Sequence, residues 1–344
     1  MSLSAAPDRP AAPMPFYASG KRSRDLAREM GISEAELLSR HQGPEVTRLR
    51  AHAGDLVEAL PALGEIMALT RNEGAVHEIV GTFAGISIAG PMGLVVAPPL
   101  DLRLFLNHWV HLFAVEIPSE DKDPRRSIQV FDKAGDAVIK IHLRPASDVS
   151  AFEAIRSRFM ERGGPKAPAF EPYRDADAPA GKVDAAGFRR DFAAMRDVHE
   201  FFPILRRYGL DRRASLDLMG EDHARRLAPG AATAILTQAA SAQLPIMCFV
   251  GNRGAIQIFT GRVKTVRAMG PWINVLDPGF DLHLREDLVA EAFAVRKPTK
   301  DGPLTSVELF AANRTMIAQF FGERQRDEPE RCDWSALIAG LPKT

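Results

Sequence analysis

The sequence predicts an α+β protein built as a tandem structural duplication, in which each half combines helices with a large antiparallel β-sheet. Three observations support this fold class. The chain matches itself at an offset of 180 residues, with 17 identities over the 55 positions from 67 to 121, where average composition gives roughly three. Helical patterns precede short apolar runs in both copies. A stretch rich in Pro, Asp, Ala and Gly separates the copies.

The first half is expected to start after a flexible tail, residues 1–20, which is rich in Ala, Pro and Ser. Ser23 to Leu38 has the pattern of a helix, a glycine turn and a second, serine-capped helix. A further amphipathic helix is predicted from Leu56 to Leu69. Short apolar runs between Ala75 and Leu143 then predict an antiparallel meander, and a helix returns from Val149 to Met160.

The second half repeats this order after a predicted linker. Helices are expected at residues 185–208, 213–219 and 232–242, and a second meander runs from Ile246 to Gly322. We therefore divide the chain into a tail, an N-terminal repeat, a linker and a C-terminal repeat, at residues 1–20, 21–166, 167–182 and 183–344.

Composition narrows the class of protein. Acidic and basic residues balance at 44 each, which argues against a general nucleic-acid binder. The two cysteines, Cys248 and Cys332, form no CxxC pair, so neither a disulfide framework nor covalently attached haem is expected. The N-terminus has no apolar signal region, and no stretch approaches 18 apolar residues. We expect a reduced, cytoplasmic protein without membrane insertion.

A histidine distinguishes the second copy from the first. Phe192, Met195, His199 and Phe202 follow the spacing of one helix face, so His199 is expected on an apolar stripe. Pro203 should kink this helix at that turn or start a new one. An imidazole among aromatic rings is a candidate axial ligand for haem iron. The alternative is a core histidine bonded to a carbonyl.

Cationic residues could complete such a site. Arg103 lies between two leucines, on the opposite face of its strand, where the second copy has His283. An arginine there needs an acidic partner or a bound ligand. Candidate donors to haem propionates, which could equally be exposed charges at strand or helix ends, are Arg212, Arg213, Arg296, Lys297 and Arg324.

These motifs carry a family resemblance. The runs FVGNRGAIQIFTG, GPWINVLDPGFDLHL and VRKPTKDGPLTSVELF, with DVHEFF and DLRLFLNHW upstream, resemble the bacterial haemin-transport or haemin-degrading factors of Gram-negative haem-uptake systems. The similarity extends from about residue 20 to Leu341. It implies two similar halves and one non-covalently bound haem b in a cleft lined mainly by the C-terminal half. The family's axial histidine matches His199, and its distal arginine matches Arg103.

The resemblance also implies further contacts. Arg212, Lys297 and Arg324 match propionate or pocket residues, and Phe249 matches a pocket aromatic residue. A second histidine described in some members matches His77. Its neighbours Ala75 and Ile79 share its strand face, so a structural strand histidine is the alternative.

The sequence leaves the activity open among three functions. The first is a haem carrier that receives haem after import, with a haem importer ATPase or a downstream haem oxygenase as partner. The second is an enzyme that opens the porphyrin and releases iron, since the same residues serve both roles. The third is a regulatory protein that uses its helix-turn-helix-like N-terminus. Either a monomer or a homodimer is compatible with the sequence.

Overall fold

The computed structural model describes residues 16–119, 122–162, 168–173, 183–324 and 328–343. The described part of the first half contains η1 (Phe16–Ser19), α1 (Ser23–Glu29), α2 (Glu34–Arg40), β1 (Val46–Leu49), α3 (Ala53–Ala59), η2 (Leu60–Leu63), β2 (Glu65–Arg71), β3 (Ala75–Thr82), β4 (Ile86–Ala89), β5 (Met92–Ala97), β6 (Leu100–Phe105), η3 (Leu106–His108), β7 (His111–Ile117), β8 (Arg125–Phe131), β9 (Ala137–Leu143) and α4 (Val149–Phe159).

The second half repeats this series. Its described elements are α5 (Ala185–Ala193), η4 (Val198–Glu200), α6 (Phe201–Arg207), α7 (Arg212–Met219), β10 (Ala224–Leu227), α8 (Ala231–Ser241), β11 (Ile246–Gly251), β12 (Ala255–Gly261), β13 (Val266–Met269), β14 (Trp272–Asp277), β15 (Phe280–Arg285), η5 (Glu286–Leu288), β16 (Glu291–Lys297), β17 (Leu304–Phe310), β18 (Met316–Gly322) and α9 (Cys332–Ala339). The predicted α+β class and its duplication are confirmed.

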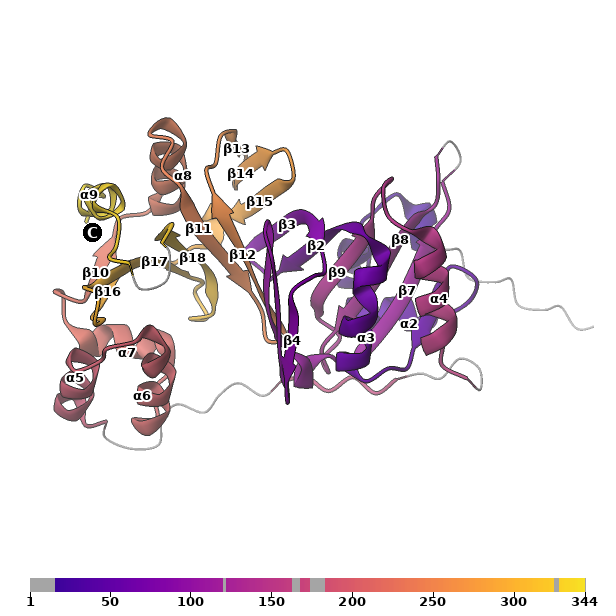
Figure 1. Ribbon diagram of the computed structural model, residues 1–344, viewed down its shortest axis with the longest axis horizontal. Coiled ribbons are helices and arrows are strands. Elements are labelled where there is room, and N and C mark those ends of the chain that lie inside the picture. The colour runs from indigo at the N-terminus through magenta and orange to yellow at the C-terminus, as the bar shows by residue number, and fades with distance from the viewer. Residues whose placement is uncertain (1–15, 120–121, 163–167, 174–182, 325–327, 344) are drawn as a thin grey trace, which may run out of the picture.

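The two halves exchange strands, which the sequence did not predict. Among the described residues the strands form two antiparallel nine-stranded sheets (Figure 1). In the N-terminal sheet the order is β1-β7-β8-β9-β2-β3-β15-β14-β13, and in the C-terminal sheet it is β10-β16-β17-β18-β11-β12-β6-β5-β4. Each half therefore gives a three-stranded arm to the other half's sheet. The β15–β3 pairing joins one arm to the N-terminal sheet, and the β6–β12 pairing joins the other arm to the C-terminal sheet.

Equivalent asparagines fasten the halves where they cross. The Asn72 side chain donates to the carbonyls of Gly251 and Ile317 and accepts from two amides of its own turn. Asn252 does the same toward Arg71 and Val138. Each amide thus closes a turn in one half and bonds the backbone of the other, so the crossing point is stabilised from both sides.

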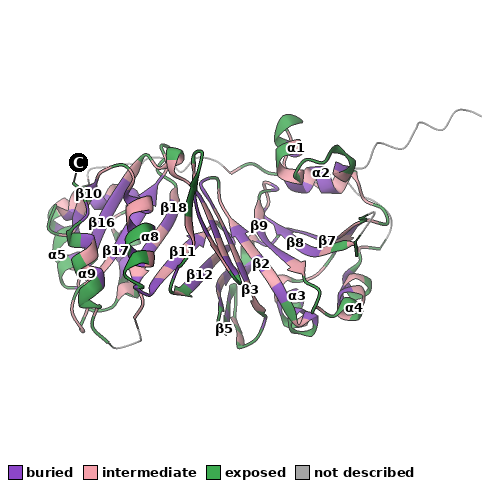
Figure 2. Ribbon diagram, turned by 90° about the horizontal axis from the view of Figure 1, so that it is seen from above, coloured by how far each residue is buried: buried purple, intermediate pink, exposed green. Residues whose placement is uncertain are grey.

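Helices cover both faces of each sheet. One continuous core lies between the sheets and helices α3, α4, α8 and α9, and Figure 2 shows these helices exposed only on their outer sides. On the opposite face of the C-terminal sheet, α5, α6 and α7 enclose a separate core with Phe293, Val295 and Phe310. Helices α1 and α2 cover the equivalent face of the N-terminal sheet. The packing of α2 buries Leu37 and Leu38 against this face.

Two predicted helices differ from the structure. The helix predicted from Leu56 to Leu69 ends at Gly64, whose φ of 69° stops it, and residues 65–71 form β2. The helix predicted for residues 185–208 is broken between Ala193 and Val198. The predicted tail lies mostly outside the described residues, although Phe16 is buried against α2 and β1. Of the predicted linker, residues 168–173 lie within the described part. Across the described residues, every helix is too short or too polar to span a membrane.

Strand exchange predicts the behaviour of an isolated half. Residues 183–344 alone would leave the β12 edge without β6 and the β15 edge without β3. Because β15 is the counterpart of β6, two copies can satisfy both edges by exchanging arms. We expect this fragment to form a dimer, measured by light scattering after size-exclusion chromatography. A folded monomer with a cooperative unfolding transition would contradict the exchange.

Candidate functional site

One face of the C-terminal sheet collects most of the predicted site residues. Residues directly opposite each other on neighbouring strands share a face, as do alternate residues along one strand. Glu308, Gln319 and Phe249 are opposite one another across β17, β18 and β11. Two residues beyond Phe249, the register continues from Gly251 through Ile256 to Arg103. Strand exchange therefore places Arg103, an N-terminal residue, on the same sheet face as Phe249, the face that carries α5–α7.

His199 lies in the helical layer over this face. It occupies the 3-10 turn η4, between the buried side chains of Met195 and Phe201. Asp197 caps this turn: its Oδ1 accepts from the His199 backbone N–H at 2.8 Å and contacts Nδ1 at 2.6 Å. The imidazole is 91 % exposed. Both the apolar stripe and the core-histidine alternative are therefore wrong, because the break before Asp197 turns His199 away from the helix core.

Pro203 begins a new helix, one of its two predicted effects. Helix α6 starts at Phe201, so Pro203 lies in the first turn, where its missing N–H costs no hydrogen bond. The two adjacent rings separate: Phe201 is buried, whereas Phe202 is 58 % exposed. His199 and Phe202 thus present an imidazole and an apolar ring together outside the core.

Beneath Phe201 is a buried polar cluster. Arg212 donates two hydrogen bonds to Glu308, at 2.8 and 2.7 Å, and Lys297 Nζ donates to the same carboxylate at 2.9 Å. Both cations also face the Phe201 ring at 5.4 Å. Burial lowers the pKa of Lys297 to about 8. Burial opposes ionisation of Glu308, yet Arg212 and Lys297 hold its pKa well below the ordinary value.

This cluster carries one carboxylate for two cations, so it retains a positive charge. Ser306 completes it by donating to Glu308 at 2.9 Å. A net charge in a desolvated position favours a nearby anionic group. Arg212 and Lys297 thus lie together as the sequence predicts, with Glu308 as the shared partner that the sequence did not indicate.

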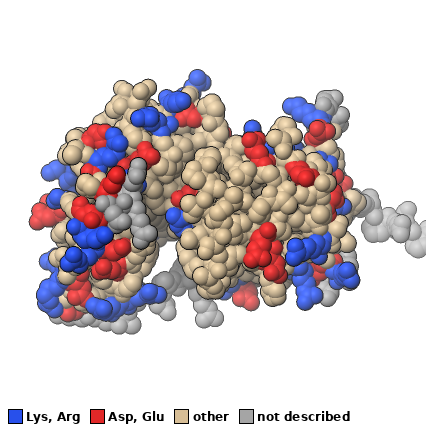
Figure 3. Space-filling model, in the orientation of Figure 1, with Lys and Arg blue, Asp and Glu red and all other residues tan. Residues whose placement is uncertain are grey.

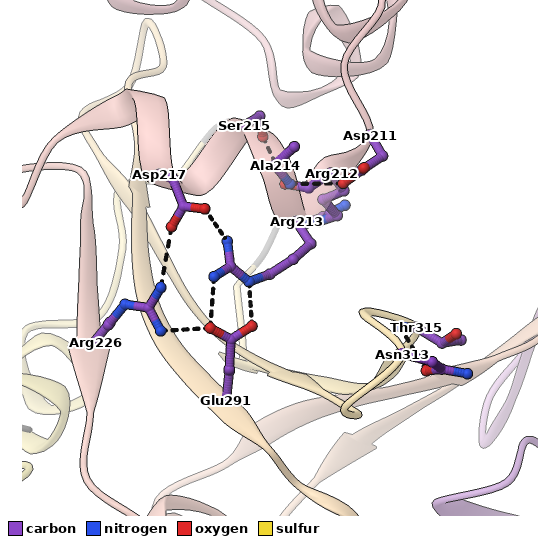
Figure 4. A network of polar contacts seen from close by, with 10 residues as sticks. All are labelled: Asp211, Arg212, Arg213, Ala214, Ser215, Asp217, Arg226, Glu291, Asn313 and Thr315. Carbon is purple, nitrogen blue, oxygen red and sulfur yellow. Dashed lines mark hydrogen bonds and ion pairs between the residues drawn. The ribbon is translucent and has the colours of Figure 1, made fainter. Parts of the chain in front are cut away.

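A second ionic network fixes the helix that bears Arg212. Arg213, the next residue, donates to Glu291 and Asp217, and Arg226 bridges the same two carboxylates (Figure 4). These hydrogen bonds lower the pKa of Glu291 to about 2. Figure 4 shows Arg212 pointing away from this network. Arg213 therefore anchors α7 to β10 and β16, leaving Arg212 to the cluster at Glu308.

Arg103 has the acidic partner that its strand position called for. Its guanidinium contacts Asp101, two residues earlier on the same face, and donates to the Leu102 carbonyl. The side chain remains 36 % exposed. Directly opposite Arg103 on β5 is Leu94, which is exposed, as is Val96. The end of the sheet face beyond Arg103 is therefore open and apolar.

A cleft of about 1170 Å³ extends from this face toward α1. Phe249, Ile256 and Gln319 line it from the C-terminal sheet, and Arg28 lines it from the first half. Figure 3 shows Lys and Arg interspersed with Asp and Glu over the face of the molecule that it presents. Gln319 was missed by the sequence analysis. Its buried Nε2 has no hydrogen-bond partner among the described residues, and a single amide in a strand gave no sequence signal that could have identified it.

His77 lies apart from this face, and Arg324 lies beyond the end of one of its strands. His77 is fully buried in the N-terminal sheet, on the face away from α1 and α2. Its ring is edge-on to the Phe280 ring at 5.1 Å, and burial lowers the pKa of His77 to about 3. Arg324 follows β18 and is partly exposed. Within the described residues, His, Cys, Asp and Glu form no cluster of three or more that could hold a metal ion.

The equivalent face of the first half has different chemistry. Glu34 is the counterpart of Arg212, and it pairs with Lys140, the counterpart of Gln319. Gln129 stands in place of Glu308, and it donates to Ser127. The first half therefore holds a neutral ion pair where the second half keeps an uncompensated cation.

The protein is a strand-exchanged α+β duplication. One sheet face combines an exposed histidine above it, an apolar wall formed by Leu94 and Val96, and a cationic cluster. These features define a binding protein for an apolar molecule with anionic groups. The comparisons identify its family. The chain belongs to the family of the haemin-degrading HemS/ChuX domain, whose model matches residues 31–159 and 209–341, one match in each half. The family predicted from the sequence motifs is confirmed.

Close relatives cover nearly the whole chain. The hemin transport protein HmuS of Yersinia pestis is 43 % identical over 94 % of this chain and 93 % of its own. The holo structure of PhuS, a heme-binding protein from Pseudomonas aeruginosa, has 41 % identity and a TM-score of 0.89 over 96 % of each chain. ChuS, an E. coli heme oxygenase, has 39 % identity and a TM-score of 0.85 over 92 % of this chain and 95 % of its own.

Because the cluster is buried, we expect Glu308 to contribute strongly to the free energy of unfolding. Glu308→Gln leaves Arg212 and Lys297 buried without their counter-charge, so we expect a loss of about 3 to 5 kcal/mol in the free energy of unfolding. Urea unfolding followed by circular dichroism measures it. The control is Glu221→Gln, an exposed carboxylate of the same half, which should change stability by less than about 0.5 kcal/mol. Equal unfolding curves for both variants would contradict the assigned cluster.

Proposed function

We propose that this chain is a cytoplasmic haem-binding protein that takes up haem after import and passes it on for use of its iron. His199 is the proposed axial ligand, and Arg103 is the proposed residue on the other side of the haem. The observation that carries the proposal is the presentation of one exposed, hydrogen-bonded imidazole over a sheet face that also carries an apolar wall and a positive cluster. Haem combines the three groups that such a site would accept: iron, an apolar ring and two carboxylates.

The residues present fit haem. With Nδ1 held by Asp197, the other ring nitrogen of His199 is available to iron. Phe202, Leu94 and Val96 offer exposed apolar surface for the porphyrin. The positive cluster and the unpartnered Gln319 amide offer charge and a donor to propionates. When bound, haem supplies the iron chemistry.

The exchanged arm gives the proposed site a contribution from each half. Arg103 reaches the face through β6, whereas His199 comes from the C-terminal helices. One strong bond from His199 to iron, with a displaceable contact from Arg103 on the other side, would allow haem to be bound tightly but reversibly. Such binding suits a carrier. Arg103 already pairs with Asp101, so it can leave the haem without becoming an unpaired charge.

Haemin titration tests the assigned ligand. For His199→Ala we expect an altered Soret band and a dissociation constant raised about 100-fold, equivalent to about 3 kcal/mol. His52→Ala, which removes an exposed histidine of the first half, is the matched control and should behave as wild type. An unchanged spectrum in His199→Ala would assign the iron to another residue.

The same complex distinguishes a carrier from an enzyme. The family description and the relative ChuS favour haem degradation as the second candidate function. We expect the Soret band to persist when ascorbate and catalase are added, and haem to reach apo-myoglobin or a haem oxygenase faster than free dissociation allows. Decay of the band with release of chelatable iron, despite catalase, would establish the enzyme instead.

Lys297 predicts a pH dependence of haem affinity. Its pKa is about 8 in the folded protein, and a nearby propionate would favour its protonated form and raise that pKa. Affinity should therefore be constant below about pH 8 and fall above it, by up to tenfold per pH unit. Haemin titrations from pH 6.5 to 9.5 measure this. Lys297→Met should flatten the profile, and the exposed-site control Lys264→Met should not. Identical profiles for all three proteins would contradict the role of Lys297.

A further inference from the structure

The turn that carries His199 makes two hydrogen bonds to one oxygen atom. Oδ1 of Asp197 accepts from the backbone N–H of His199 at 2.8 Å and lies 2.6 Å from its Nδ1. An ionised carboxylate can only accept, so Nδ1 carries a proton, and in the neutral imidazole Nε2 then bears the free lone pair. One side chain thus fixes both the backbone of the turn and the tautomer of the ring.

The first copy of the duplication makes the backbone hydrogen bond without the bond to a ring. Asp197 and His199 correspond to Ser19 and Lys21 in the first half. There the backbone N–H of Lys21 donates to the Ser19 hydroxyl at 3.2 Å, at the end of η1. A neutral side chain at this position can therefore accept the same backbone hydrogen bond. The carboxylate occurs in the copy whose capped residue is a histidine, and its additional effect is the bond to the ring.

The neighbouring residues hold this pair in place. Met195 and Phe201 are buried on either side of the turn, so the backbone between them has little freedom. The imidazole ring and the carboxylate themselves lie outward, with Asp197 57 % exposed. A ligand covering the imidazole would exclude water from the bond and strengthen it. The pair is thus preorganised before any ligand arrives.

We propose that Asp197 is a positioning residue for haem iron, which holds His199 with Nε2 directed outward and increases the electron donation of its imidazole to the metal. This inference rests on the proposed function, since it requires His199 to be the ligand. Carboxylate partners of metal-binding histidines fix the ring and raise its basicity, and their loss usually lowers metal affinity or activity about 10- to 100-fold. Asp197 would therefore set both the residence time and the reduction potential of the bound haem.

The test compares Asp197→Ser, which places the first half's hydroxyl acceptor at this position, with Asp197→Asn, which keeps a neutral amide acceptor. We expect haemin to dissociate about 10- to 100-fold faster from Asp197→Ser. In the ferrous complex, the iron–histidine stretching frequency should fall and the reduction potential should rise. Asp197→Asn should lie between this variant and wild type. The control is Asp184→Ser, the same exchange at the N-cap of α5, and circular dichroism checks the fold of every variant.

The outcomes separate the inference from the function on which it rests. If Asp197→Ser and Asp197→Asn keep the wild-type stretching frequency and potential while His199→Ala alters the haem spectrum, Asp197 is a cap alone and the inference fails. If His199→Ala also leaves the spectrum unchanged, the ligand assignment itself fails. A shift in Asp184→Ser equal to that in Asp197→Ser would likewise overturn the inference, because the effect would then come from helix capping.

Discussion

The pairing of β6 with β12 is the contact on which the candidate site depends. It carries Arg103 from the first half onto the sheet of the second, opposite Ile256 and in line with Gly251. The reciprocal pairing of β15 with β3 and the crossed bonds of Asn72 and Asn252 hold the exchange closed. Because each arm completes the other half's sheet, neither half contains the whole candidate site, and backbone hydrogen bonds fix the position of Arg103 on the C-terminal sheet.

The duplicated scaffold serves different purposes in its two halves through a few charge changes. Glu34 and Lys140 neutralise each other in the first half, whereas Glu308 faces both Arg212 and Lys297 in the second. The fold tolerates both arrangements because each cation is hydrogen-bonded to a carboxylate. The second arrangement keeps a positive charge available to an anionic ligand. The capped turn also differs, with Ser19 and Lys21 replaced by Asp197 and His199.

Much of the fold could be predicted from the sequence, because strand periodicity is local and the duplication is visible as identities. The exchange of arms could not, since the pattern of β6 is equally satisfied beside β3 or β12 and pairing is decided by distant contacts. Of the site, Arg103 was predicted on the strand face opposite Leu102 and Leu104 and has that position. The apolar stripe through His199 failed because helix α5 ends at Ala193 and Asp197 caps a new turn. Gln319 was missed because one buried amide leaves no periodic signal.

The binding of haem between a C-terminal histidine and an N-terminal arginine is the central claim, and a crystal structure of the haemin complex tests it most directly. The account predicts iron bound to Nε2 of His199, with Nδ1 still held by Asp197. It also predicts Arg103 on the opposite side of the porphyrin and the propionates toward Lys297 and Gln319. Iron bound to another residue, or haem on the equivalent face of the N-terminal sheet, would contradict it.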